Sequence, residues 1–202
     1  MKRIILILIM IILITPQVAH AKDSGWEFRF FGINYKDFEN RDWKPMIVGA
    51  IVSLAAHELG HIVTGRLVGM DTTFKFNDMM AWADDYDNKS NDQKALYHAG
   101  GFISQVVIGS VLTAIPTTRH SDFAVGFNGF SSITGFSYAV TGGTRKDSSD
   151  VANLDNDGYN GTATALTSGF ITGGLTYINL NKVKEDINDS PDVSYLQTTK
   201  YD

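Results

Sequence analysis

The chain has 202 residues, a formal net charge of −5 and no cysteine. The lack of cysteine excludes disulfides, thiolate metal ligands, a cysteine nucleophile and a lipid-modified cysteine. The acidic balance, without a basic cluster beyond the first few residues, argues against nucleic acid as a partner.

The N-terminus has the pattern of a secretory signal peptide, expected over residues 1–21. Lys2 and Arg3 form a basic start, residues 4–14 are an apolar run, and Ala-His-Ala at 19–21 is a small-x-small cleavage sequence. An uncleaved membrane anchor is the alternative interpretation.

Apolar segments of helix length follow the signal peptide. Pro45 opens the first of them, which predicts a helix over Met46–Met70, long enough to cross a bilayer with some tilt. Ala95–Pro116 carries no formal charge and Thr162–Leu180 has a similar length, so both also predict membrane spans. A weaker segment, Phe123–Thr141, is rich in Gly, Phe and Ser and predicts a buried helix, a re-entrant piece or a marginal span.

A polar stretch separates the first two apolar segments. Residues 71–94 contain six aspartates, and the run Thr72–Phe76 predicts a short strand. The expected fold class is therefore mainly α: a polytopic membrane helical bundle with a polar insertion, for which β structure is one option, after the first span. One domain is expected over residues 22–181, before a polar disordered tail over residues 182–202. Because the mean hydropathy of the whole chain is near zero, a secreted, soluble helical protein stays open as the alternative.

The most specific chemical signal is a His-Glu-x-x-His sequence inside the first apolar segment. Residues four apart share one face of a helix, so His57 and His61 can present their imidazoles to one metal ion. Glu58 lies beside them, near the water that a zinc ion would hold in its open position. Zinc lowers the pKa of that water to about 7, and a carboxylate can then take its proton. The motif predicts zinc-dependent amide hydrolysis, and the alternative is a pair of helix histidines with ordinary hydrogen-bonded roles.

Residues 57–69 resemble the active-site helix of the site-2 protease family of intramembrane zinc metalloproteases. In that family too the motif lies in a transmembrane helix and is followed by small residues, a basic residue and a glycine. The next helix of the family often carries Ala-Gly-Pro near its start, and Ala-Gly-Gly at 99–101 is similar, with Gly101 in place of the proline. The resemblance covers residues 46–115 well and the rest of the chain loosely.

The resemblance implies a third zinc ligand, an aspartate near the start of a later helix, usually in a Leu-Asp-Gly context. This sequence departs from that pattern and offers two aspartates. Asp150 heads a short apolar stretch, where a ligand can be held rigidly, and Asp157 precedes Gly158 as in the family's dipeptide. Asp150 is the preferred ligand and Asp157 the alternative, and a solvated turn carboxylate is the competing interpretation of each.

Two further observations bear on the site. His98, at the start of the second apolar segment, is a candidate to support a ligand or to polarise a substrate, and an interfacial side chain is the alternative. Another class of zinc protease places a glycine and a histidine where this chain has Thr64 and Leu67, so that class fits less well.

The expected function is that of a zinc-dependent endopeptidase that hydrolyses peptide bonds of membrane-associated substrates, with Glu58 as the general base toward zinc-activated water. Zinc is the expected cofactor, and a peptide or membrane protein and membrane lipid are the expected partners. The expected location is a membrane of the secretory or cell-envelope pathway, with the periplasm or secretion as the alternative. The functional alternatives are a secreted soluble zinc peptidase and a non-catalytic membrane scaffold with a structural or vestigial zinc site.

Overall fold

The computed structural model describes residues 29–30, 33–142 and 149–188. The expected signal peptide lies outside these residues. The chain divides into two units, residues 1–41 and 42–202. In the first unit, β1 (Arg29–Phe30) and β2 (Ile33–Asn34) pair as antiparallel strands, and the 3₁₀ helix η1 (Tyr35–Phe38) follows them.

The second unit opens with the long helix α2 (Trp43–Leu67). The helix begins before the predicted Met46 because Asp42 caps it: the Asp42 carboxylate accepts a hydrogen bond of 3.0 Å from the backbone N–H of Lys44. Pro45 lies in the first turn, where the backbone N–H that it lacks would have no partner within the helix. The cap therefore fixes the start of the helix that carries the His-Glu-x-x-His motif.

Helix α2 ends at a left-handed glycine that turns the chain into a β-hairpin. Gly69 has a φ of +77°, a backbone conformation that suits a helix C-terminus and that glycine adopts at little cost. The hairpin pairs β3 (Thr72–Lys75) with β4 (Met80–Ala83) as antiparallel strands. The strand predicted within Thr72–Phe76 is thus observed as β3.

The remaining elements of the unit are η2 (Tyr86–Asn88), α3 (Asn91–Ala114), α4 (Pro116–Arg119), α5 (Asp122–Thr141), α6 (Asp150–Asn156) and α7 (Gly161–Asn188). Helix α3 begins before the predicted Ala95 because Ser90 and Gln93 form a reciprocal capping box. Ser121 and Ser149 cap α5 and α6, since their hydroxyls accept hydrogen bonds from the backbone N–H groups of Ala124 and Ala152. Side-chain caps thus set the starts of all three helices.

Helix α7 continues beyond the predicted apolar segment. The backbone is helical through Asn188, within the segment for which the sequence predicts a polar disordered tail. The physical reason is local: residues 181–188 contain neither Gly nor Pro and include the strong helix formers Lys and Glu. The rest of the predicted tail, residues 189–202, lies outside the described residues.

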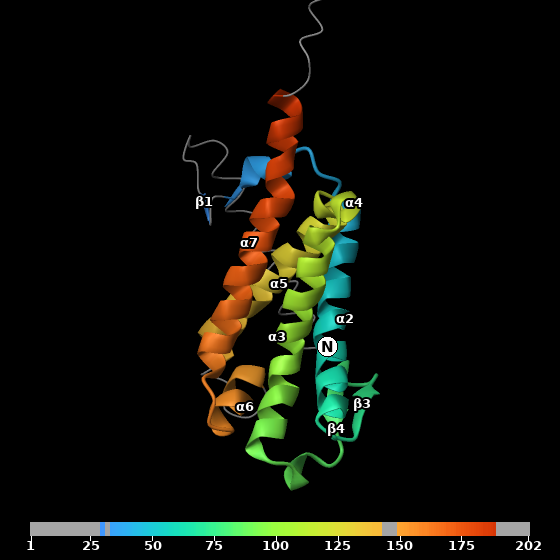
Figure 1. The fold of residues 1–202 in the computed structure, drawn as a ribbon, viewed down its shortest axis with the longest axis vertical. Coiled ribbons are helices and arrows are strands. Elements are labelled where there is room, and N and C mark those ends of the chain that lie inside the picture. Colours follow the sequence, from blue (N-terminus) through green and yellow to red (C-terminus); the bar gives the residue numbers. More distant parts are fainter. Residues whose placement is uncertain (1–28, 31–32, 143–148, 189–202) are drawn as a thin grey trace, which may run out of the picture. The chain divides into compact units, whose positions relative to one another are not determined.

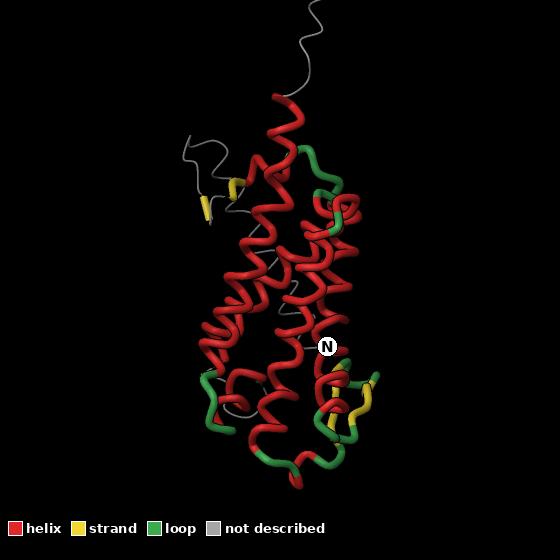
Figure 2. Tube along the Cα trace, viewed as in Figure 1, coloured by secondary structure: helices red, strands yellow, loops and turns green. Residues whose placement is uncertain are grey.

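Within this unit, the long helices α2, α3, α5 and α7 run alongside one another as a bundle, in which α2 contacts α3 and α5, and α7 contacts α5 and α3 (Figure 1). The hairpin and α6 lie toward the same end of the bundle (Figure 2). Small residues allow close helix contact: a side chain at Gly60 of α2 or at Gly100 of α3 would overlap the backbone of the other helix. Ser53 of α2 and Ser131 of α5 are joined by a hydrogen bond of 2.8 Å.

Helix α2 buries its small and polar residues and exposes its large apolar ones. The buried residues of α2 are Gly49, Ser53, Ala56, His57, Gly60, His61 and Gly65. The exposed large apolar residues are Trp43, Ile47, Val48, Ile51, Val52, Leu54, Leu59, Val63 and Leu67. A helix packed into a water-soluble protein normally shows the opposite distribution.

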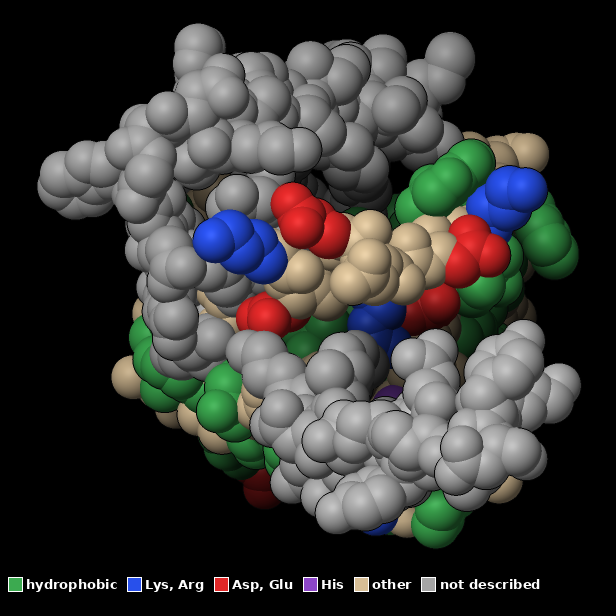
Figure 3. All heavy atoms as spheres, turned by 90° about the horizontal axis from the view of Figure 1, so that it is seen from above, with side chains coloured by type: hydrophobic (Ala, Val, Ile, Leu, Met, Phe, Trp, Pro, Cys, Tyr) green, Lys and Arg blue, Asp and Glu red, His purple; other side chains and the backbone are tan. Residues whose placement is uncertain are grey.

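Two of the described helices, α2 and α3, are long and apolar enough to cross a membrane, judged by length and composition. The other segments predicted to approach or span the membrane coincide with α5 and α7, which do not reach this standard within the described residues, so their crossing stays a prediction. In the end view of Figure 3, charged side chains are visible on the face shown.

Candidate metal centre

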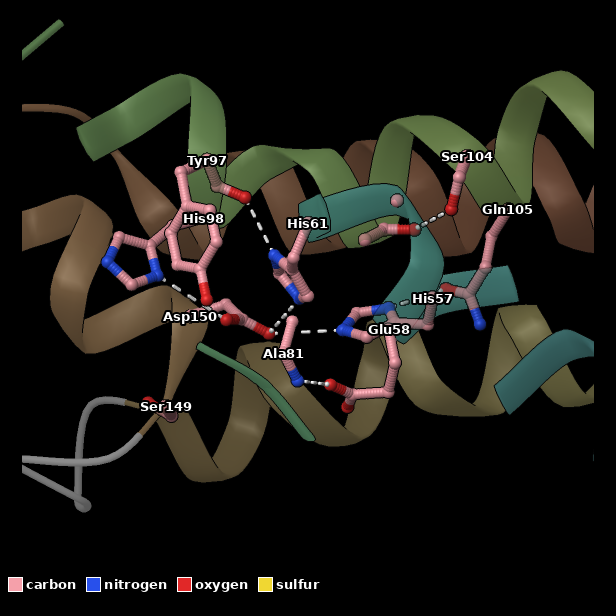
Figure 4. A network of polar contacts seen from close by, with 12 residues as sticks. His57, Glu58, His61, Ala81, Tyr97, His98, Ser104, Gln105, Ser149 and Asp150 are labelled. Carbon is pink, nitrogen blue, oxygen red and sulfur yellow. Dashed lines mark hydrogen bonds and ion pairs between the residues drawn. The ribbon is translucent and has the colours of Figure 1, made fainter. Parts of the chain in front are cut away.

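Three potential metal ligands from distant parts of the chain meet in the second unit. His57 and His61 lie one turn apart on α2, and Asp150 is the first residue of α6. The Nε2 atoms of His57 and His61 lie 3.1 Å and 3.5 Å from the same carboxylate oxygen, Asp150 Oδ2 (Figure 4). One candidate ligand atom from each residue lies within 4.8 Å of the others. The two imidazoles are buried, and the Asp150 side chain is 15% exposed.

The other nitrogen of each imidazole faces a hydrogen-bond acceptor. His57 Nδ1 lies 3.2 Å from Gln105 Oε1, and the amide nitrogen of Gln105 donates to Ser53, which fixes the orientation of the amide. His61 Nδ1 lies 2.7 Å from the backbone carbonyl oxygen of Tyr97. Because these oxygens accept hydrogen bonds, Nδ1 is the donor in each of these two contacts, and Nε2 of each ring is left to face Asp150. This is the usual arrangement of histidines that bind a metal.

The packing of helix α6 brings Asp150 to the histidines. Val151 is fully buried and packs in one cluster with Phe102 of α3 and Ala165 of α7. Ser149 starts the helix by accepting a hydrogen bond from the N–H of Ala152. Asp150 therefore sits between a capped helix start and a buried anchor, which directs its carboxylate into the bundle.

The site requires positive charge. Burial by itself would raise the pKa of the Asp150 carboxyl, but positive charge on His61 and hydrogen bonds from His57, His61 and His98 hold that pKa well below its usual range. Two imidazole lone pairs and an ionised carboxylate oxygen at these distances repel one another unless protons or a metal ion lie among them. Two imidazoles and one carboxylate, without a thiolate, suit zinc and leave a coordination position open. The residues present therefore fit a zinc ion.

Glu58 lies beside the three potential ligands and is not one of them. Its side chain is half-buried, and its Oε2 atom accepts a hydrogen bond of 2.9 Å from the backbone N–H of Ala81 in β4 (Figure 4). The described group that could hold a metal consists of the two histidines and Asp150. A carboxylate next to such a group is placed to exchange protons with a water or a leaving group there.

The alternative third ligand, Asp157, is placed elsewhere. It is the C-terminal cap of α6 and does not belong to the described group of potential ligands. Burial raises the pKa of its carboxyl, and the nearby His98 lowers it in part. His98 itself is buried, and its Nδ1 lies 3.6 Å from Asp150 Oδ1.

Several supporting residues were not predicted from the sequence. Gln105 is one, although a lone amide side chain in the middle of an uncharged apolar segment was a usable signal. The Tyr97 carbonyl had no sequence signal, because every residue carries a backbone carbonyl. Gly101 is a third, since a Cβ built on it would lie 2.5 Å from Nε2 of His57. The position at which Gly101 stands in place of the proline of the resembled family therefore contacts a potential ligand, His57.

A Gly101→Ala variant is expected to weaken zinc binding. The added methyl group would displace the His57 imidazole from its position, and changes next to metal ligands typically cost about 10- to 100-fold in metal affinity. Zinc affinity of the purified variant, measured by competition with a chelator, checks this expectation. Gly174→Ala in α7 is the matched control, because its Cβ would meet nothing within 4 Å. Equal zinc affinity of the Gly101→Ala variant and the wild type would show that position 101 does not constrain the His57 imidazole.

Comparison with known proteins adds no further assignment. No protein-family model, curated protein or solved structure matches the chain. The function of the site therefore rests on the residues and distances described above.

Proposed function

We propose that this chain is a membrane-embedded zinc endopeptidase of the site-2 protease type. The observation that carries the proposal is the convergence of His57, His61 and Asp150, with Glu58 beside them. The resemblance of residues 57–69 to the active-site helix of that family supports the same assignment. Hydrolysis of an amide bond needs a metal-activated water, a base and a polarised carbonyl, and this arrangement of residues can provide them.

Each residue has a defined part in the proposed reaction. Bound zinc supplies a Lewis acid that acidifies a water molecule and polarises the scissile carbonyl. His57, His61 and Asp150 would hold the ion, while Gln105 would keep the His57 imidazole in its tautomer. Glu58 takes the proton from the attacking water and then delivers it to the nitrogen of the leaving amine.

The distribution of side chains on α2 supports a location within a membrane. Large apolar residues of α2 and α3 are exposed, and the histidines and small residues face the bundle. In water this surface would be costly, whereas lipid chains solvate it. His61 lies six residues before the end of α2 at Leu67, which corresponds to about 9 Å along the helix axis. The site therefore lies near one end of the proposed span, where water can reach it.

The edge of β4 is suited to an extended peptide. The N–H of Asp84 bonds to the carbonyl of Asp71, so these two residues form a hydrogen-bonded pair. Opposite pairs in an antiparallel ladder alternate between hydrogen-bonded and non-hydrogen-bonded pairs. The N–H and C=O groups of Ala81 and Ala83 in β4 therefore point away from β3. The outward N–H of Ala81 bonds to Glu58. A substrate added as a strand along this edge would pass beside the proposed general base.

The proposal is tested on the full chain in its own membrane. We expect the protein to remain in membranes washed with alkaline carbonate and, after purification in detergent, to contain about one zinc per chain. We also expect it to cleave some members of a panel of single-span substrates, to lose this activity on chelation and to regain it when zinc is added.

Three results would contradict parts of this proposal. Recovery in the soluble fraction with the same zinc-dependent cleavage would favour a secreted zinc peptidase. Stoichiometric zinc without cleavage of any substrate would favour a scaffold with a structural zinc site. A protein that neither contains nor binds zinc would overturn the assignment of the metal centre.

A further inference from the structure

The two carboxylate oxygens of Asp150 have different neighbours. His57 and His61 both face Oδ2, whereas a third histidine, His98 of α3, faces Oδ1 at 3.6 Å. His98 is buried, and its Nδ1 has no hydrogen-bond partner among the described residues. A buried polar nitrogen without a partner is costly, so the nearby carboxylate oxygen is its natural acceptor. One oxygen of Asp150 is thus directed to the metal centre and the other to His98.

The far side of the His98 ring is held by a tyrosine. The Tyr86 hydroxyl lies 2.9 Å from His98 Nε2, and the two ring centroids lie 5.5 Å apart in an edge-to-face arrangement. Figure 4 shows His98 beside Asp150. Burial, the negative charge of Asp157 and a hydrogen bond with the Asp157 carboxylate raise the pKa of Tyr86 to about 12, so the hydroxyl keeps its proton near neutral pH. When Tyr86 donates that proton to Nε2, the nitrogen of His98 that donates is Nδ1, which faces Asp150.

We propose that Tyr86 and His98 are positioning residues that hold Asp150 by Oδ1 and so present Oδ2 to the metal ion. This inference rests on the proposed function, because it assigns a role toward the same metal. In many metal sites a carboxylate orients a ligand histidine. In this chain the order is reversed, and a histidine that is not a ligand orients the ligand carboxylate.

Tyr86 lies in the same chain segment as the residue that holds Glu58. Tyr86 belongs to η2, which follows β4 directly in the chain, and β4 holds Glu58 through the N–H of Ala81. One continuous segment, residues 80–88, therefore contacts the proposed base directly and the third ligand through His98. A displacement of this segment would alter both.

The test measures metal binding and metal geometry, and it does not depend on a cleavage assay. The full chain is purified in detergent as wild type, Tyr86→Phe, His98→Leu and His98→Asn, and zinc affinity is measured by competition with a chelator. The absorption spectrum of the Co²⁺-loaded protein reports ligand geometry. Tyr159→Phe is the matched control, because it removes a tyrosine hydroxyl that bonds to Asp92, which is not one of the potential ligands.

We expect His98→Leu to lower zinc affinity about 10- to 100-fold and Tyr86→Phe to lower it about tenfold, each with a changed Co²⁺ spectrum. His98→Asn should recover part of the loss, because its amide nitrogen can donate to Oδ1 from nearly the same position as Nδ1. Wild-type affinity and spectrum in Tyr86→Phe and in a folded His98→Leu would overturn this inference and leave the metal centre intact. A wild-type protein that binds neither metal would overturn both this inference and the proposed function.

Discussion

Glu58→Gln is expected to give a folded, zinc-loaded protein whose proteolytic rate is lower by about 10²- to 10⁴-fold, the usual contribution of general acid–base catalysis. The substitution keeps the size of the side chain and an oxygen that can accept the hydrogen bond from the N–H of Ala81. It removes the basicity needed to take a proton from water. Because Glu58 is not among the described potential ligands, zinc content should not change.

The experiment compares zinc content and the cleavage rate of a single-span substrate for the wild type and the variant in detergent. Glu39→Gln is the matched control, because it neutralises an exposed glutamate in the first unit. A Glu58→Gln protein as active as the wild type would remove Glu58 from the mechanism. Loss of zinc from that variant would instead indicate that Glu58 is a ligand.

Asp150→Asn is expected to lower zinc affinity by about a hundredfold or more, whereas Asp157→Asn should change it by less than about threefold. Removing a ligand from a three-ligand site should cost at least as much as the 10- to 100-fold loss typical of residues that only support a ligand. The amide at position 150 can still donate hydrogen bonds to the imidazole nitrogens. We therefore expect the variant to fold without metal, because these buried nitrogens keep a hydrogen-bond partner.

The two isosteric variants are matched, since Asp150 is the first residue of α6, Asp157 caps the other end of that helix, and both changes remove one negative charge. Zinc affinity is measured by chelator competition, with helix content from circular dichroism as the check on folding. If Asp157→Asn causes the larger loss, the Asp-Gly dipeptide was the better guide to the ligand. Small losses in both variants would show that another residue completes the site.

The sequence by itself determined the local features of this protein. The four-residue spacing of His57 and His61 places both on one helical face in any α-helix, and the surrounding apolar segment predicted that helix. Residues 72–76 predicted the strand that is observed as β3. The helix starts at Asp42 and Ser90 also follow local chemistry, since a side chain caps the backbone a few residues away. These features depend on contacts between near neighbours, which a sequence pattern records directly.

Only the tertiary structure decided which residues surround the motif. Asp150 is 93 residues from His57 in the chain, and its position depends on how α6 packs against α3 and α7. Gln105 and Gly101 reach His57 because α3 crosses α2 at glycines that permit close approach. Helix α2 exposes large apolar residues over much of its surface, so its hydrophobic pattern does not reveal which face meets which helix. Contacts between such distant residues depend on how whole helices pack against one another. The residues that determine this packing are spread over the chain, so no local motif predicts the contacts.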